Sequence, residues 1–240
     1  MSNPTAAMLV IGDEILSGRT RDANMYFLAG ELTKHGIDLK EVRVVSDDPD
    51  AIVSSVQALA KAHDQVFTSG GIGPTHDDIT ADCIARAFGV HIDIRADARA
   101  LLQAHYDKTG LELNEARLRM ARIPDGATLI DNPVSTAPGF TIENVHVMAG
   151  VPNIFQAMVA SVLPTLTGGA PLLSQTLRVN RGEGDIAEIL TEAAQTFEDL
   201  SIGCYPFQVN GAYGANVVVR GTNGARVDAA VTQLAKDLEV

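Results

Sequence analysis

Short apolar runs alternate with amphipathic helical segments along the first third of the chain. Residues 6–11, AAMLVI, are apolar throughout, which is typical of a buried strand. Beyond Asn24, apolar side chains recur at helical spacing for about three turns. The runs 42–46 and 65–69 are again strand-like, and each precedes a helical pattern. This alternation predicts parallel strands joined by right-handed crossovers with helices.

The middle of the chain continues this pattern with an excursion from the sheet. Residues 95–121 are predicted to form two further helices. The runs 127–131 and 144–150 are predicted to return to the sheet as strands. A last helix is expected from Pro152, because proline is tolerated in the first helical turn, where its missing N–H costs nothing.

A linker is predicted at PTLTGGAP, residues 164–171, which combines proline, glycine and threonine without periodicity. Beyond it the pattern reads as strand, helix, two strands and helix, a βαββα unit. We therefore expect two domains, residues 1–167 and residues 168–240. The second is large enough for a small α+β layer but is marginal in size on its own.

The charge balance narrows the classes of partner. There are 30 Asp and Glu against 18 Lys and Arg, a net charge of −12. Sequence-independent binding to nucleic acid or to an anionic membrane needs a basic face, so we expect neither partner. No apolar run reaches the roughly 18 residues of a membrane-spanning helix, and residues 1–5 lack a signal-peptide pattern. Cytoplasmic localisation and a small-molecule ligand are the resulting expectations.

The two cysteines support no metal site or disulfide framework. Cys83 and Cys204 lie far apart in the sequence, without CxxC spacing. Since free cysteine is among the most buried residue types, each is expected to be a buried structural thiol.

Polar or glycine-bearing segments follow the predicted strands directly. In open α/β sheets, ligands bind beyond the carboxyl ends of the strands. Such segments at the same sheet edge would form one composite site. The five segments are residues 12–18, 46–50, 69–80, 132–140 and 149–153.

The segment 69–80, SGGIGPTHDDIT, is the strongest single indication of a ligand. Its three glycines permit close approach of backbone N–H groups to an anion, and the following helix adds its positive N-terminal end. Neither the GxGxxG nor the GxxxxGK[ST] nucleotide pattern is present. The alternative is a tight turn in which the threonine and the aspartates only cap the helix.

Two pairs of adjacent aspartates suggest that a divalent cation accompanies the anion expected at the glycine-rich loop. Capping needs one acid, whereas Asp77 and Asp78 are neighbours, and Asp47 and Asp48 follow the preceding strand. Carboxylates with phosphate oxygens suit Mg²⁺ or a similar divalent cation, which removes the repulsion between them. The alternative for residues 47–50, DDPD, is a helix-capping turn.

Taken in order, these motifs resemble one known family. The chain is similar to the MoaB/Mog-type molybdopterin-binding fold, and most of all to the amino-terminal region of CinA-like (competence/damage-inducible) proteins. The resemblance covers roughly residues 6–165 and continues weakly beyond them. The motifs that carry it are VIGDEILSG, the Asn24 that follows, SGGIGPTHDDIT, NPVSTAPGF and AGVPN.

The resemblance implies a three-layer α/β/α sandwich with a mostly parallel sheet and a site for a phosphate-bearing pterin or a dinucleotide-like ligand. It implies that Asp78 and Asp47 are catalytic and, with Asp77, hold the metal. No permanently bound organic cofactor is expected. Ser69 and Ile72 depart from the family's TGGTGP pattern, and Ile72 loses a hydroxyl that could contact phosphate. The expected ligand-binding residues are Gly12, Asp13, Glu14, Gly70, Gly71, Gly73, Thr75, Ser135 and Gly139.

The functions implied by the family are a metal-dependent pyrophosphatase of ADP-ribose or a similar dinucleotide, adenylyl transfer to molybdopterin, and a non-catalytic nucleotide- or pterin-binding module. A homodimer is compatible with the resemblance. His76 is expected to be an exposed loop residue, with contact to phosphate as the alternative. Arg19 and Arg21 could either reach a phosphate or be exposed at the approach to the helix. No Ser–His–Asp pattern is present. The stretch 113–122, LNEARLRMAR, is interpreted as a solvated, mixed-charge helix face.

Overall fold

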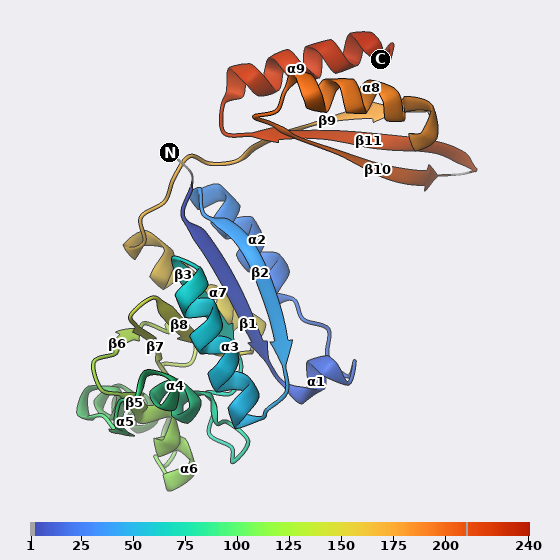
Figure 1. Cartoon of the computed structure of the whole chain (residues 1–240). Helices are drawn as coiled ribbons and strands as arrows, with labels where there is room; N and C mark the ends of the chain where they lie inside the picture. The colour runs from blue at the N-terminus through green and yellow to red at the C-terminus, as the bar shows by residue number, and fades with distance from the viewer. Residues whose placement is uncertain (1–2, 210) are drawn as a thin grey trace. The chain divides into compact units, whose positions relative to one another are not determined.

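The computed structural model describes residues 3–209 and 211–240, and the chain divides into two compact units between Gly169 and Ala170 (Figure 1). The boundary expected from the linker composition, between residues 167 and 168, lies two residues earlier. Each unit has its own sheet and its own apolar core.

The first unit is built on a mixed sheet in which all strands but one run in the same direction. Strand β1 pairs in parallel with β2 and β3, and β3 pairs in parallel with β8. Strand β7 is antiparallel to both of its neighbours. The predicted mostly parallel sheet is therefore confirmed. The strand order is β2 (Asp38–Val45), β1 (Thr5–Ile11), β3 (Gln65–Ser69), β8 (Val145–Met148), β7 (Gly139–Ile142) and β6 (Thr128–Ile130).

Helices cover both faces of this sheet, which makes the three layers. Strand β1 is buried on both sides, because alternate residues enter different cores: Leu9 packs under α3 (Pro49–Ala62) and α4 (Thr80–Phe88), and Met8 under α2 (Asn24–His35) and α7 (Pro152–Val162). A strand buried on both faces needs no polar alternation, which explains its continuous apolar sequence. The predicted three-layer α/β/α sandwich is confirmed.

The excursion between α4 and the returning strands contains more short pieces than the sequence indicates. Helix α5 (Ala96–Thr109) was expected, but the second helix is only α6 (Glu115–Leu118) followed by the 3₁₀ turn η1 (Arg119–Ala121). A two-stranded pair, β4 (Ile92–Ile94) and β5 (Arg122–Pro124), brackets them. Strands of three or four residues, such as these and β7, are too short to show a period, so the sequence does not reveal them.

The second unit has the predicted βαββα order. Its antiparallel sheet has the order β10 (Ser201–Val209), β11 (Ala212–Gly221) and β9 (Leu173–Val179). Helices α8 (Glu183–Thr196) and α9 (Gly224–Asp237) enclose a core with the central strand, in which Ile186, Val217 and Leu234 are fully buried.

The two cysteines differ in burial. Cys83 is buried, and burial raises the pKa of its thiol to about 11, which makes it unreactive, as expected of a structural thiol. Cys204 is only half-buried, contrary to the expectation, because it lies on β10, an edge strand of the second sheet.

Candidate functional site

A cleft of about 620 Å³ lies at the carboxyl ends of the parallel strands of the first unit. It is the composite site that the strand order predicts, because every one of the five strand-end segments contributes to its wall. Gly12 and Glu14 come from the first segment, Asp47 from the second, residues 70–74 with Asp77 and Asp78 from the third, Ser135 and Ala137 from the fourth, and residues 149–152 from the fifth.

The glycine loop is packed so closely that its first two glycines admit no side chain. Gly70 and Gly71 have φ values of 111° and 69°. A Cβ on Gly70 would lie 2.3 Å from the carbonyl oxygen of Ile11, and one on Gly71 would lie 2.1 Å from Oγ1 of Thr80. Glycine at these positions is therefore required by both conformation and space.

Thr80, the first residue of α4, holds this loop in place. Its hydroxyl donates to the carbonyl of Gly70 (3.0 Å), and its backbone N–H donates to the carbonyl of Gly71 (2.9 Å). The side chain is fully buried, so the hydroxyl and the Gly70 carbonyl satisfy one another away from water.

Asp78 closes the turn that follows the glycines. Its Oδ2 accepts hydrogen bonds from the backbone N–H (2.8 Å) and the hydroxyl (2.7 Å) of Thr75. Asp77 is exposed and lies 3.9 Å from Nδ1 of His76, which is itself fully exposed, as expected. Neither acid caps α4, which begins after Ile79 without a side-chain cap, so the helix-capping alternative does not hold.

Asp47 and Asp48, at the end of β2, have different roles. Asp48 accepts a hydrogen bond from the N–H of Ala51 (2.8 Å) and is the N-cap of α3, which is the capping turn that the alternative reading described. Asp47 faces the cleft instead, and its Oδ2 accepts from the backbone N–H of Asp13 (2.9 Å).

The environment of Asp47 is unfavourable to a negative charge. Burial raises the pKa of its carboxyl group, and the charges of Asp13, Glu14 and Asp77 add to the rise, against the opposing hydrogen bond from the Asp13 backbone. Four acidic residues of the described part of the chain line the cleft: Glu14, Asp47, Asp77 and Asp78. The cationic side chain in the same wall is that of Arg19, so the acids outnumber the cations among the described residues.

The opposite wall is organised by Asn132, which is 3 % exposed. Its Nδ2 donates to the hydroxyl oxygen of Ser135 (2.7 Å) and to the carbonyl of Ala137 (2.8 Å). Because Ser135 accepts this bond, its own hydroxyl hydrogen is available to a ligand in the cleft.

Asn24 joins the ends of two strands below the cleft. It is the first residue of α2 and is 3 % exposed. Its Nδ2 donates to the hydroxyl oxygen of Ser69 and to the carbonyl of Gly150, both at 2.8 Å. The Asn24 amide therefore positions the last residue of β3 against the segment that follows β8.

Three of the expected binding residues lie outside the wall. Asp13 orients Asp47 through its backbone, and Thr75 binds Asp78. Gly139 is a buried residue of β7, where a Cβ would lie 2.4 Å from the carbonyl oxygen of Val147, so the glycine serves strand packing. The expected residues that do line the cleft are Gly12, Glu14, Asp47, Gly70, Gly71, Gly73, Asp77, Asp78 and Ser135.

The residues that sequence reasoning missed are polar groups with structural partners. Thr80 and Asn132 stand inside motifs that were recognised, but nothing in their spacing indicates that their side chains hold neighbouring loops.

The donor set at the cleft consists of oxygens. Among the described residues no group of three or more His, Cys, Asp or Glu side chains is placed to hold a metal ion, so Asp47, Asp77 and Asp78 do not by themselves form a metal centre. Carboxylates without imidazole or thiol partners fit a hard cation such as Mg²⁺, which binds one or two protein carboxylates and completes its shell with phosphate oxygens and water.

Residues 7–168 match the family described as "Probable molybdopterin binding domain", and residues 171–240 match "FAD synthase, middle domain". The chain belongs to the family of molybdopterin-binding domains of the MoaB/Mog type. Within it the chain is CinA-like: the crystal structure of the protein CinA, of unknown function, from Thermoplasma acidophilum superposes with a TM-score of 0.63 at 35 % identity, covering 69 % of this chain and 99 % of that one.

Two curated relatives extend the similarity across both units. A protein named "Probable FAD synthase" from Caenorhabditis elegans is 34 % identical, covering 96 % of this chain and 49 % of that protein. The chain thus spans about half the length of that relative. "Protein PYRAB15930" from Pyrococcus abyssi is 35 % identical, covering 80 % of this chain and 81 % of its own.

No helix in residues 3–209 and 211–240 is long and apolar enough to cross a membrane.

Proposed function

We propose that the cleft binds a dinucleotide-like diphosphate, such as ADP-ribose, together with a divalent cation, and hydrolyses the diphosphate. The observation that supports this most is the meeting of the glycine loop with Glu14, Asp47 and Asp78 in a cleft of about 620 Å³. Such a volume lies in the range of pockets that take drug-sized or cofactor-sized ligands. The loop suits the phosphates, and the acids suit the cation.

The backbone of the glycine loop has the first role in this reaction. The N–H of Gly70 already donates to the carbonyl of Met148 (3.1 Å). The N–H groups of the residues that follow Gly70 in the loop can face the phosphoryl oxygens, because Gly71 carries no Cβ and Thr80 keeps the loop rigid. Donors that are already in position need no reorganisation when negative charge develops in the transition state. Water attacks one phosphorus, the P–O–P bond breaks, and ADP-ribose gives AMP and ribose 5-phosphate.

Asp47 and Asp78 have the second role. Each uses one carboxylate oxygen within the protein, for the Asp13 N–H and for Thr75 respectively. The other oxygen of each carboxylate has no hydrogen bond within the described part of the chain and remains for a cation or for the attacking water. A bound Mg²⁺ would supply charge neutralisation at the phosphoryl oxygens.

The substitution Asp47→Asn tests this assignment. Asparagine keeps an oxygen that can accept from the Asp13 N–H but loses the negative charge, so the fold is expected to remain while Mg²⁺-dependent hydrolysis of ADP-ribose falls at least about 100-fold. Turnover is measured by separating AMP and ribose 5-phosphate, with chelator in parallel.

The matched control is Asp50→Asn. Asp50 is an exposed acid in the first turn of α3, where it pairs with Arg86 (2.7 Å) outside the cleft, so the same charge change there should leave turnover within about twofold. Equal turnover in Asp47→Asn and wild type would rule out the proposed role of Asp47. Ligand binding without any turnover in the wild type would identify a binding module.

Adenylyl transfer is the second candidate, and the similarity to a protein named "Probable FAD synthase" favours it. Forming FAD from ATP and FMN makes the same kind of diphosphate linkage that hydrolysis of ADP-ribose breaks. Purified protein is incubated with ATP, Mg²⁺ and either FMN or a phosphorylated pterin. Release of pyrophosphate with an adenylylated product would replace the hydrolase assignment by a transferase.

A further inference from the structure

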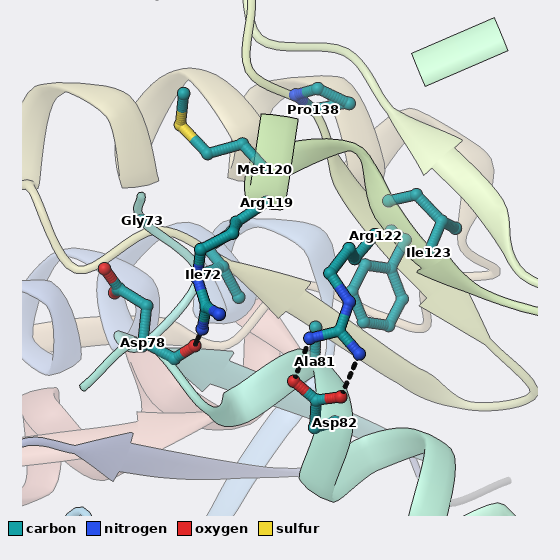
Figure 2. A pocket seen from close by; sticks show the side chains of 12 residues that line it. Ile72, Gly73, Asp78, Ala81, Asp82, Arg119, Met120, Arg122, Ile123 and Pro138 are labelled. Atoms are coloured by element: carbon teal, nitrogen blue, oxygen red, sulfur yellow. Dashed lines mark hydrogen bonds and ion pairs between the residues drawn. The ribbon is translucent and has the colours of Figure 1, made fainter. Parts of the chain in front are cut away.

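A small chamber lies behind the glycine loop, between the loop and the excursion that contains η1 (Figure 2). Its volume is about 20 Å³. Gly71, Gly73 and Asp78 line both the chamber and the cleft, so the two spaces adjoin. A space needs roughly 10–15 Å³ to hold one water molecule. The chamber therefore has room for a single oxygen atom of water or of a ligand.

One of the two arginines of the chamber is already neutralised. Arg122 donates from Nη1 (2.7 Å) and Nη2 (2.5 Å) to the two carboxylate oxygens of Asp82, and Figure 2 shows this fork. Such a bidentate pair satisfies the guanidinium and its charge together. Arg122 therefore holds the wall of the chamber and has little to offer an anion.

Arg119 differs from its neighbour in having no acid partner. Its Nη2 donates to the backbone carbonyl of Asp78 (3.1 Å), as Figure 2 shows. The carboxylate of Asp78 is bound to Thr75 instead. Among the described residues no carboxylate forms an ion pair with Arg119. Arg119 therefore carries a positive charge beside the glycine loop that no carboxylate ion pair compensates within the described residues.

The Nε–H of Arg119 is buried and has no acceptor within the described residues. A buried donor without an acceptor costs about 1–3 kcal/mol, and more when the group is charged. An anionic oxygen in the adjoining chamber that accepted from the Arg119 guanidinium would form the stronger, charge-assisted hydrogen bond.

We propose that this chamber is a subsite for one phosphoryl oxygen of the ligand and that Arg119 is its cationic donor. The proposal rests on the proposed function and deepens it by assigning the anion-binding side chain. The cleft then holds a diphosphate between two kinds of partner. Asp47 and Asp78 would hold a cation that neutralises charge on the ligand, and Arg119 with the loop N–H groups would donate hydrogen bonds to its phosphoryl oxygens. The stretch 113–122, expected to be a solvated face, contributes this contact.

The experiment measures binding of the non-hydrolysable methylene-bridged analogue of ADP-ribose and of inorganic pyrophosphate to the full chain with Mg²⁺, by calorimetry. Arg119→Gln removes the charge and is expected to weaken both ligands about 10- to 100-fold. Arg117→Gln is the matched control, because Arg117 belongs to the same excursion but stacks over Tyr106 (4.8 Å from the ring centroid) and is absent from the chamber wall. It should change affinity less than about twofold.

A third variant keeps the test decisive if Arg119→Gln does not fold. Arg119→Lys retains the positive charge but lacks the planar guanidinium donors, so an affinity at least about threefold weaker than that of wild type supports the subsite. Equal affinity in Arg119→Lys and wild type, or in Arg119→Gln and Arg117→Gln, overturns it and leaves the proposed function standing. A wild type that binds neither ligand overturns both.

Discussion

Burial, together with the acidic surroundings of the cleft, changes the pKa of Asp47. Burial raises the pKa of its carboxyl group, with Asp13, Glu14 and Asp77 adding to the rise. A carboxyl group whose pKa is raised on folding favours the folded protein when the pH lies below its pKa in the unfolded chain, near 3.8. This contribution to stability is lost as the pH rises through the higher pKa of the folded protein. At neutral pH the charged Asp47 therefore destabilises the ligand-free protein.

Asp47→Asn is accordingly expected to be more stable than wild type when no ligand is bound. The variant should melt about 1–3 °C higher at pH 7, and the difference should shrink on acidification, as the pH falls through the raised pKa of the wild-type carboxyl group and the group gains its proton. Thermal denaturation by circular dichroism over this pH range measures it. A difference that is the same at every pH would exclude the electrostatic explanation. Loss of turnover with gain of stability is what a residue kept for function shows.

At the scale of single elements, the connection between β3 and α4 depends on the contact between Gly71 and Thr80 more than on the helix propensity of its residues. Gly71 and Thr80 approach so closely that a Cβ would lie 2.1 Å from the threonine hydroxyl. Helix α4 consequently starts where the loop can be held, at Thr80 and not at the two aspartates before it.

The substitutions Gly71→Ala and Gly89→Ala separate the two reasons why position 71 requires glycine, which are its positive φ and the close approach of Thr80. Both glycines have positive φ, 69° and 67°, but a Cβ on Gly89 meets nothing within 4 Å. Gly89→Ala should cost about 1–2 kcal/mol from backbone conformation alone, and Gly71→Ala about 1–3 kcal/mol more from the clash with Thr80. Denaturant unfolding measures both. Equal costs would show that the loop relaxes freely, against the rigid loop described above.

How well an element could be predicted from the sequence depended on its length and burial. The apolar run of β1 and the helical periods of α2 and α3 extend over enough residues to reveal each element. Strand β7 has four residues and lies partly in a segment expected to be a loop. The strand-end segments of the cleft were predictable for the same reason, since strand order alone brings them together. The position of Arg119 beside the loop was not, because the Asp78 carbonyl to which it donates lies 41 residues away in the sequence.

At the scale of the whole chain, one buried titratable group makes the first unit sensitive to acid. His146, on β8, is enclosed between neighbouring strands, with Nδ1 2.9 Å from the hydroxyl oxygen of Thr141 and Nε2 2.8 Å from Oε1 of Gln65. Burial lowers the pKa of His146 to about 4, from an ordinary value of 6.5. The folded unit therefore contains the neutral imidazole.

This arrangement predicts a loss of stability on acidification. Between pH 6.5 and 4 the unfolded chain binds a proton at this position and the folded unit does not, so the contribution is complete above pH 6.5 and is lost as the pH falls. The loss amounts to about 3 kcal/mol at most. In His146→Gln, which keeps polar partners for Thr141 and Gln65, the free energy of unfolding should fall less steeply between pH 7 and pH 4. Parallel curves for variant and wild type would contradict the assignment.

The sequence by itself determined the order of the longer elements, the division into two units and the five strand-end segments of the cleft, because periodicity, turn residues and parallel strand order are local or topological properties. Only the tertiary structure decided which side chains of those segments serve the site. It places Asp47 in the cleft and Asp48 on a helix N-terminus, it engages Asp78 with Thr75, and it leaves Arg119 without an acid partner. These roles depend on atoms that distant parts of the chain bring within a few ångströms, and spacing along the sequence carries no information about such distances.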